Sequence, residues 1–460
     1  MITTTPWQHQ RAAADFAIRR RRAMLCVPMG GGKSLSAIIV AAETGCRSIV
    51  VLCPMSVVGV WRREFARHAP GAFAVIAPSG GVKEKAAAIA EQTALAEARG
   101  RPIVVVVNYE SAWRAPLSKL LTDRLWDLLI LEESHRIKAP FGAASKFATD
   151  LGKSSRRRLA LTGTPAPHSP LDLFAQARAI DASVFGWSFV SFRNRYAVTD
   201  PVYKNKVRRW INQDELQRKF RELAYECDLT GVLDVPEATD QTVTVQLGAK
   251  ARKLYDQLEQ EMWAEVDRGE VTIANALVRL LRLQQLCSGH VVTDDGGAQT
   301  IDDAKRQALA DLLDDIPNDV PVVVFARFVR DLDAIAEIAA TAGREYGEIS
   351  GRRKDLDAHA CMPPHVRLMG VQTQSGGVGI DLTAAGVAVY YSTGLSLGDY
   401  LQSRARLHRP GQKRHVSFLH LVAEGTVDET ILAALERRQE VIESVLHGRA
   451  RPAASTQAAA

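Results

Sequence analysis

Residues 23–43 read AMLCVPMGGGKSLSAIIVAAE. A short apolar run ends at Val27, a glycine-rich turn follows, and a helix-like segment begins near Lys33. A turn of this kind between a strand and a helix presents backbone N–H groups and a helix N-terminus to a phosphate group. The lysine reaches the outer phosphates of a nucleotide, and the Ser34 hydroxyl ligates magnesium. The strict pattern has glycine at position 27, where this chain has valine.

Strand-like apolar runs repeat along the chain, each followed by a helix-like stretch. In the first 180 residues they lie at 23–27, 48–53, 102–107, 128–133 and 158–163, and the rhythm returns at 321–327, 366–373, 387–392 and 416–422. Continuous Val, Ile and Leu runs separated by helices indicate a parallel sheet covered on both faces. The sequence therefore predicts an α/β protein with two parallel-sheet lobes in tandem. We expect lobes at 1–180 and 301–446, a mainly helical insertion at 181–300, and a disordered tail at 447–460.

Composition narrows the class of protein. A chain of 460 residues is too long for one ordinary core, so two or three domains are expected. The net charge of +6 is compatible with a polyanionic partner. The six cysteines form no C-x-x-C pair, which favours reduced thiols in a cytoplasmic protein. No apolar run is long enough to predict a membrane span, and the N-terminal residues do not read as a signal peptide.

Two adjacent glutamates follow the apolar run at 128–131. Carboxylates at the end of a buried strand cost free energy unless a cation or a reaction needs them. An enzyme that transfers phosphoryl groups needs an acid to hold magnesium and a group to orient the attacking water. We assign Glu132 to the metal and Glu133 to water activation. A solvated acidic turn is the alternative that this motif alone leaves open.

The motifs together resemble, in order, those of the Swi/Snf-type ATPases of superfamily-two helicases. The matching segments are PWQHQ (6–10), MGGGKS (29–34), VVLCPMSVVGVWRREF (50–65), VNYES (107–111), EESHRIK (132–138), LALTGTP (159–165), LLRLQQLCSG (280–289), SGGVGIDLTAA (375–385), QSRARLHRPGQ (402–412) and LVAEGTVDETI (421–431). The resemblance spans about residues 6–446 and implies two RecA-like lobes. It departs at Glu132, where the family has aspartate.

The resemblance also implies residue roles. The nucleotide-binding set is Gln10, which reads the adenine, with Gly30, Gly31, Gly32, Lys33 and Ser34. Catalysis falls to Lys33, Glu133, Arg406 and Arg409, the two arginines stabilising charge on the γ-phosphate. Coupling of hydrolysis to DNA contacts falls to His135, Thr162, Gly163, Thr164 and Gln402, for which strand-end capping is the open alternative. Contacts to nucleic acid fall to Ser56, Trp61, Thr373, Gln374 and Ser375. Core packing is an equal alternative for Trp61.

The resemblance implies an ATP-dependent translocase or remodeller of double-stranded DNA, using ATP and Mg²⁺, in replication, repair or recombination. A strand-separating helicase acting on DNA or RNA is one alternative. A nucleotide-gated binding module with little turnover is another, because Glu132 replaces the family's aspartate. The chain acts alone or as the motor of a larger machine, and its Ala- and Arg-rich composition points to a bacterial or phage-infected cell.

Overall fold

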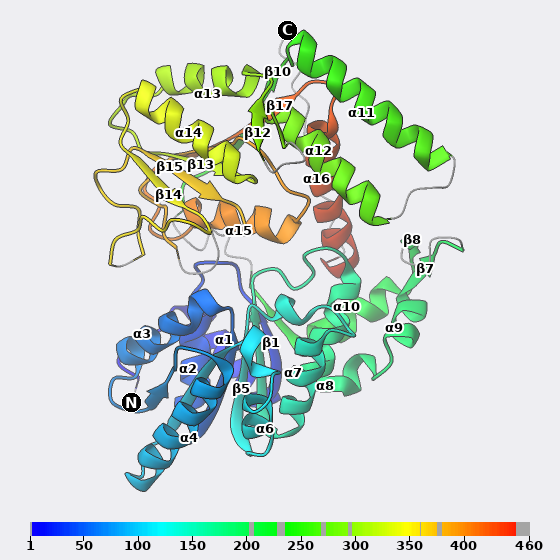
Figure 1. The fold of residues 1–460 in the computed structure, drawn as a ribbon. Coiled ribbons are helices and arrows are strands. Elements are labelled where there is room, and N and C mark those ends of the chain that lie inside the picture. The colour runs from blue at the N-terminus through cyan, green and yellow to red at the C-terminus, as the bar shows by residue number, and fades with distance from the viewer. Residues whose placement is uncertain are drawn as a thin grey trace. The chain divides into compact units, whose positions relative to one another are not determined.

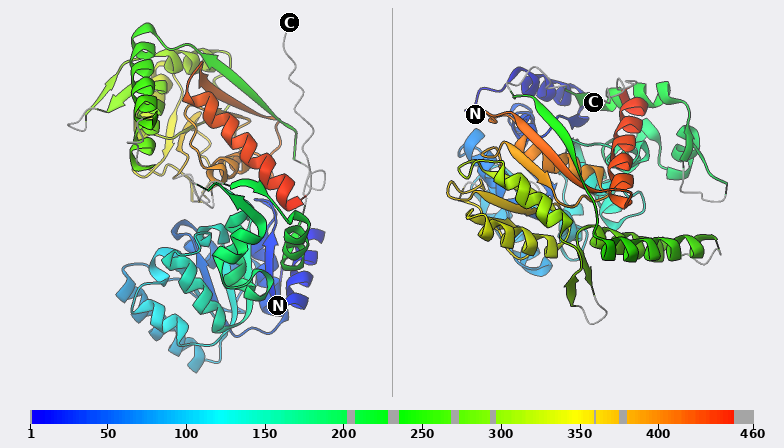
Figure 2. Two further views of the ribbon diagram at one scale, coloured as in Figure 1. Left: turned by 90° about the vertical axis from the view of Figure 1, so that its right-hand side faces the viewer. Right: turned by 90° about the horizontal axis from the view of Figure 1, so that it is seen from above.

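A computed structural model describes residues 2–201, 207–227, 235–267, 273–292, 297–358, 360–374 and 380–447. They form two compact units (Figure 1). The first unit contains residues 2–227 together with 438–447, and the second contains residues 235–437. Figure 2 gives two further views of the same ribbon. Within the described part of the chain, no helix is both long and apolar enough to cross a bilayer.

The first unit is built on a seven-stranded sheet in which all neighbouring strands run parallel. Across the sheet the order is β3 (Ala74–Ile76), β4 (Ile103–Asn108), β2 (Ser48–Cys53), β5 (Trp126–Glu132), β6 (Ser155–Thr162), β1 (Arg22–Cys26) and β9 (Ala224–Glu226). Every residue of β2 and β4 is buried, because helices cover both faces of the sheet and aliphatic side chains therefore fill both.

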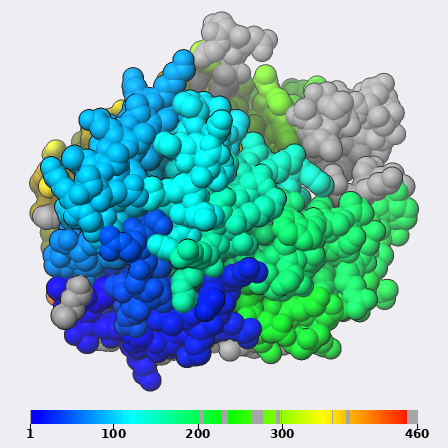
Figure 3. All heavy atoms as spheres, turned by 90° about the horizontal axis from the view of Figure 1, so that it is seen from below, coloured from blue at the N-terminus to red at the C-terminus, as the bar shows by residue number. Residues whose placement is uncertain are grey.

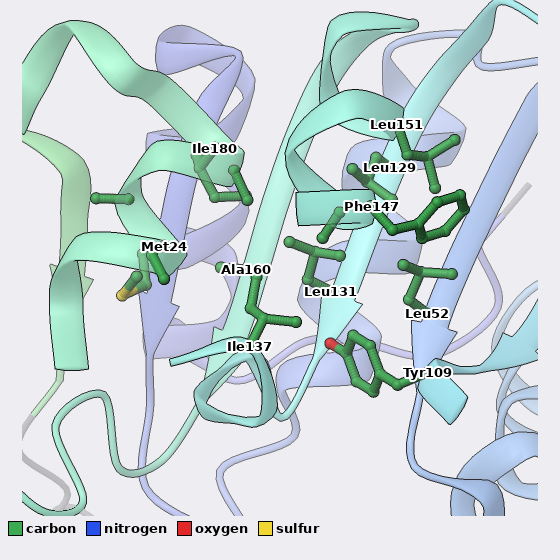
Figure 4. Packing of buried hydrophobic residues seen from close by; sticks show 14 of the residues in the cluster. Met24, Leu52, Tyr109, Leu129, Leu131, Ile137, Phe147, Leu151, Ala160 and Ile180 are labelled. Atoms are coloured by element: carbon green, nitrogen blue, oxygen red, sulfur yellow. The ribbon is translucent and has the colours of Figure 1, made fainter. Parts of the chain in front are cut away.

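Helices alternate with these strands. They are α1 (Gln8–Arg20), α2 (Lys33–Glu43), α3 (Val58–His68), α4 (Val82–Ala98), α5 (Tyr109–Ala112), α6 (Leu117–Thr122), α7 (Ala143–Lys153), α8 (Leu173–Phe185), α9 (Phe189–Tyr196) and α10 (Gln213–Leu223). An antiparallel pair, β7 (Ala197–Thr199) and β8 (Val207–Trp210), follows α9. Figure 4 shows part of the core, where Leu129, Leu131 and Ala160 of the central strands pack with Phe147 and Leu151 of α7.

The second unit contains a six-stranded sheet, also parallel throughout. Its order is β10 (Ala238–Val245), β17 (Val416–Ala423), β16 (Val387–Tyr390), β13 (Val322–Ala326), β15 (Leu368–Gln372) and β14 (Tyr346–Ile349). The helices are α11 (Ala249–Asp267), α12 (Ile273–Cys287), α13 (Ala304–Asp314), α14 (Val329–Thr341), α15 (Leu397–Leu407) and α16 (Val427–His447). A hairpin of β11 (His290–Val292) and β12 (Ala298–Thr300) follows α12.

The expected fold class is confirmed, because the chain forms two parallel α/β sheets in tandem. The segment expected to stand apart, 181–300, is divided between the units: its residues up to 227 group with the first sheet and those from 235 with the second. Strands β9 and β10 are the reason, since each adds to the edge of one of the two sheets. The expected tail begins where the described residues end, except for position 447.

Candidate functional site

The predicted site residues of the first unit lie at the carboxyl ends of three neighbouring strands. Strand β6 lies between β1 and β5, with Thr162 opposite Cys26 and Leu161 opposite Glu132. All three strands are parallel, so their carboxyl ends meet at the same edge. The glycine-rich turn after β1, the two glutamates at the end of β5 and the Thr-Gly-Thr segment at the end of β6 are therefore neighbours.

The glycine-rich turn owes its shape to left-handed backbone. Gly30 and Gly32 have φ values of 82° and 72°, and Gly32 is the N-cap of α2. The Lys33 ammonium, at the first helical residue, donates a 3.0 Å hydrogen bond to the Val27 carbonyl. The Val27 side chain is buried in the core, so its backbone alone takes part in the turn. Valine therefore fits where the strict pattern has glycine.

Gln10 is joined to this turn from α1. Its side-chain amide donates to the Gly31 carbonyl at 3.2 Å, and its oxygen accepts the Trp7 backbone N–H at 2.9 Å. A Cβ placed on Gly32 would lie 2.0 Å from the Gln10 Nε2 atom, so this contact requires glycine at position 32. His9 adds a second bond to the Gly31 carbonyl at 2.8 Å. The sequence analysis missed His9, whose only signal is its place beside Gln10.

The two glutamates differ in their surroundings although both are buried. Glu132 ends β5, and its Oε2 atom has no hydrogen-bond partner among the described residues. Burial, followed by the charge of Glu133, raises the pKa of Glu132 to about 8, and the positive charge of Lys33 opposes this shift. Tyr109 fixes the strand end by donating from its hydroxyl to the Glu132 carbonyl at 2.9 Å (Figure 4).

Glu133 has left-handed backbone, with φ 48° and ψ 54°. A non-glycine residue in this region is strained, and such strain persists where surrounding contacts impose it. One contact is the Glu133 carbonyl, which accepts the Arg136 N–H at 2.9 Å. Another comes from the neighbouring Ser134, whose hydroxyl donates to Gln176 Oε1 at 2.7 Å. Gln176 in turn donates to the Pro165 carbonyl at 2.6 Å. The sequence gives no signal for Gln176.

A short polar chain links Glu133 to the end of β6. His135 Nδ1 lies 3.4 Å from Glu133 Oε2 and 3.3 Å from the Thr162 hydroxyl oxygen. The Thr162 hydroxyl accepts the Thr164 backbone N–H at 3.1 Å. Between them, Gly163 passes close to the glycine-rich turn, because a Cβ there would lie 3.4 Å from the Met29 backbone nitrogen. The predicted coupling residues of the first unit are thus in contact with the predicted water-activating residue.

The donor set fits a magnesium ion bound with a nucleotide. In such sites magnesium is held by one or two protein oxygens, with phosphates and water completing the octahedron. The partnerless Oε2 of Glu132 and the half-buried Ser34 at the start of α2 supply oxygens of this kind. Among the described residues no group of three acidic, His or Cys ligands could hold a metal by protein contacts alone. The arrangement therefore suits a nucleotide-dependent ion and not a protein-only metal site.

The second unit contains the predicted arginines. Arg406, near the end of α15, is buried, and its carbonyl accepts the Leu382 N–H at 3.1 Å. Arg409 is half-buried and donates to the Ile380 carbonyl at 3.4 Å. Gln412, missed as a site residue, donates to the Ala385 carbonyl at 2.9 Å. The segment after α15 is thus bonded to the loop before β16. Gln402 lies half-buried on α15, and its predicted coupling role stays a prediction.

The predicted nucleic-acid contacts have different surroundings. Ser56 is exposed in the turn before α3 and Gln374 is exposed after β15, as a contact residue requires. Thr373 is half-buried, and its hydroxyl donates to the Ala326 carbonyl at 3.2 Å. Trp61 is only 1% exposed and packs 5.9 Å from the Phe65 ring, so it is a core residue of α3. Ser375 lies outside the described residues.

Two protein-family models and several known proteins are similar to the chain. A family model described as SNF2-related domain matches residues 9–291, and one described as helicase conserved C-terminal domain matches residues 304–411. The DNA repair and recombination protein RDH54 of Saccharomyces cerevisiae (strain JAY291) is 25% identical over 84% of this chain and 45% of its own length. An uncharacterized ATP-dependent helicase of Mycoplasma pneumoniae is 24% identical over 92% of this chain and 40% of its own length.

A solved structure is also similar. The Sulfolobus solfataricus SWI2/SNF2 ATPase core in complex with double-stranded DNA is 21% identical, with a TM-score of 0.45 over 97% of this chain and 93% of that one. This chain spans less than half the length of the two curated relatives. The SNF2-related model alone covers more than half of the residues and contains every predicted site residue of the first unit. The chain therefore belongs to the SNF2-related domain family, and its residues 304–411 match the helicase conserved C-terminal domain.

Proposed function

We propose that this chain is an ATP-driven motor that moves along double-stranded DNA without separating its strands. The observation that carries the proposal is the meeting of three segments at one sheet edge: the glycine-rich turn, the buried Glu132–Glu133 pair and the Thr162–Thr164 segment. This is the set that hydrolysis of a nucleoside triphosphate needs. Membership of the SNF2-related family and the DNA-repair name of one relative support DNA as the substrate.

Each residue at the edge has a role in this reaction. The turn and α2 bind the phosphates through backbone N–H groups, and Lys33 neutralises their charge. Ser34 and Glu132 would hold Mg²⁺, which supplies positive charge to the phosphates when bound. Glu133 accepts a hydrogen bond from the attacking water and orients it toward the γ-phosphate. Its left-handed backbone ends the extended path of β5 directly after Glu132.

Transition-state charge on the transferred phosphoryl group calls for a further cation. Arg406 and Arg409 of the second unit serve this role, because guanidinium stays charged and binds phosphate oxygens through two N–H groups at once. An arginine supplied in this way is worth about 10³–10⁵ in turnover in related chemistry. Hydrolysis then depends on the second unit as well as the first, and cycles of nucleotide binding and release drive stepping.

The chain of contacts from Glu133 to Thr164 couples hydrolysis to DNA. A shift of the His135 ring changes its distances to both Glu133 and Thr162, so displacement at the β6 end alters the orientation of the catalytic carboxylate. Ser56, Thr373 and Gln374 contact phosphates of one strand of the duplex. Motion along an intact duplex avoids a stacking cost of about 1.4 kcal/mol per base-pair step.

The biological setting of the motor is replication, repair or recombination, in the cytoplasm of a bacterial or phage-infected cell. The name of the yeast relative supports repair or recombination, and the free thiols of all six cysteines support a reducing compartment. A strand-separating helicase is the second candidate function, favoured by the name of the Mycoplasma relative.

The test of the nucleotide site is Lys33→Ala, with Lys153→Ala as a matched control. Lys33 contacts the turn, whereas Lys153 is an exposed lysine paired with Asp150 at 2.7 Å. ATP hydrolysis is measured with and without duplex DNA, and circular dichroism checks the fold. We expect Lys33→Ala to abolish hydrolysis while the control retains it. Turnover by folded Lys33→Ala protein would overturn the assignment.

A further inference from the structure

Two arginine runs that are far apart in the sequence meet at the amino-terminal ends of the strands of the first sheet. Residues 19–22 end α1 and begin β1, and residues 156–158 begin β6. The parallel pairing of β1 with β6 sets Arg22 opposite Arg158, so the two runs lie side by side. Figure 3 shows a face of the protein on which atoms from the start of the chain, in blue, adjoin cyan and teal atoms from later segments. Arg47, just before β2, is exposed on the same edge.

Few acidic groups offset this charge. Arg22 pairs with Asp181 at 3.3 Å and Arg156 with Asp127 at 3.4 Å. Asp127 is largely occupied, because it also accepts the backbone N–H groups of Arg47 and Ser48 at 2.9 and 3.0 Å. Within the described residues no ion pair involves Arg19, Arg20 or Arg21, and all three are exposed. The edge therefore keeps a strong positive charge.

The arginines also border a hollow. A pocket of about 260 Å³ is lined by Arg21, Thr44, Gly45, Cys46, Asp127, Arg156 and Arg157. The Arg157 side chain is fixed at its wall by a 3.0 Å hydrogen bond from Nη1 to the Ile18 carbonyl. The Arg156 side chain is 77% exposed at its rim. A phosphate group entering this hollow would meet guanidinium groups from the end of α1 and from β6.

This surface is separate from the nucleotide site. Arg22 and Cys26 are the two ends of β1, and the four steps between them, at about 3.3 Å each, span roughly 13 Å. The glycine-rich turn lies beyond the carboxyl end of the strand, whereas the arginines lie at and before its amino end. A nucleotide bound at the turn cannot reach them. The arginines therefore have no place in the hydrolysis site.

We propose that this arginine edge, defined as residues 19–22, 47 and 156–158, binds the phosphate backbone of nucleic acid as a second contact outside the motor site. The proposal rests on the proposed function, since it takes DNA as the partner. Neighbouring strands are about 4.8 Å apart, so the guanidinium groups are closely spaced. A DNA duplex carries one charge per about 1.7 Å of its axis, denser than the carboxylates on one side of an extended acidic peptide. The guanidinium fork also matches phosphate geometry.

The experiment compares two triple variants that remove equal charge. The test variant is Arg20→Gln, Arg21→Asn and Arg156→Gln, with asparagine chosen at 21 because that residue has a φ of 62°. Asp127 keeps its backbone donors in this variant. The control is Arg209→Gln, Arg218→Gln and Arg437→Gln, exposed arginines of β8, α10 and α16 that do not adjoin the arginine edge. Duplex binding is measured at several salt concentrations, together with the duplex-stimulated ATPase.

We expect the test variant to bind duplex about tenfold more weakly than the wild type. The slope of log binding constant against log salt concentration should be shallower by about 2–3, because each lost phosphate contact removes about 0.9. The control should match the wild type. Turnover at saturating duplex should be the same in all three proteins, because the arginine edge is not in the hydrolysis site. These results would support a second phosphate contact.

Two outcomes would contradict the second contact, and a third would contradict the proposed function. A test variant that binds and titrates with salt like the control overturns the second contact, while stimulation of the wild type by duplex leaves the motor assignment intact. Polyglutamate that displaces labelled duplex from the wild type as well as unlabelled duplex does, at matched charge, also overturns the second contact. The surface would then bind any polyanion and would not be specific for phosphate. A wild type that neither binds duplex nor is stimulated by it overturns the proposed function itself.

Discussion

Replacing Gly32 by alanine tests the contact between the glycine-rich turn and Gln10. Two costs follow from the structure. A side chain at a φ of 72° costs about 1–2 kcal/mol in the left-handed region. The new Cβ would also lie 2.0 Å from Gln10 Nε2, so the glutamine must move and lose its bond to the Gly31 carbonyl. A buried polar group left unpaired costs about 1–3 kcal/mol. The expected loss in free energy of unfolding is therefore roughly 2–5 kcal/mol.

Gly45→Ala is the matched control for backbone strain. Gly45 has a φ of 65° and no atom within 4 Å of an added Cβ, so only the cost of about 1–2 kcal/mol applies. Urea unfolding measures both variants, and binding of a fluorescent ATP analogue reports on the turn. Gly32→Ala should weaken nucleotide binding, and Gly45→Ala should not. The combined variant with Gln10→Ala should lose less stability than the two single changes added together, because the clash is removed.

Two results together would show that Gly32 and Gln10 are not coupled. Gly32→Ala and Gly45→Ala would lose equal stability, and the losses of Gly32→Ala and Gln10→Ala would add in the combined variant. The Gln10 side chain would then be free to leave the turn at no cost. The glutamine would still be a candidate for adenine contact, but it would have no part in shaping the turn.

Three further predictions concern the predicted site residues. Glu133→Gln should bind nucleotide but hydrolyse it far more slowly, whereas Glu132→Asp should stay active or improve; single-turnover assays with filter binding measure both, and normal hydrolysis by Glu133→Gln would reverse the two roles. Arg409→Ala should keep nucleotide affinity and lose about 10³–10⁵ in turnover, and equal loss of both would assign it to ground-state binding. Because the pKa of Glu132 is raised from 4.5 to about 8 in the fold, the folded state holds its proton more tightly than the unfolded state, so stability should fall as pH rises from about 4.5 to 8. Urea midpoints should show this slope in the wild type without nucleotide and a flatter one in Glu132→Gln; identical slopes would place the titration elsewhere.

The sequence predicted the parts of the fold that have strong local patterns. Runs of Val, Ile and Leu become the buried strands β2 and β4, and the glycine-rich turn begins α2 at Lys33 as expected. The edge strands were missed because they lack such runs: β9 is three residues long, and β10 contains mostly exposed Thr, Asp and Gln. The two halves of segment 181–300 were therefore not assigned to their sheets.

Long-range contacts were beyond sequence reasoning. Nothing in the local pattern pairs Gln10 with Gly32, or Gln176 with Ser134, since these contacts depend on how helices cross the sheet edge. Trp61 shows the limit of motif comparison, because a residue in a recognised segment is a core side chain. The arginine runs at 19–22 and 156–158 lie far apart in the sequence, and only the β1–β6 register brings them together.

The proposed motor moves along intact duplex DNA while it hydrolyses ATP. Displacement of a third strand from a triplex, followed beside unwinding of a forked duplex under the same conditions, tests it most directly. ATP-dependent triplex displacement by the wild type, absent in Glu133→Gln and unaccompanied by fork unwinding, is the predicted result. Efficient fork unwinding, or ATPase stimulation by RNA alone, would contradict the claim and favour a strand-separating helicase.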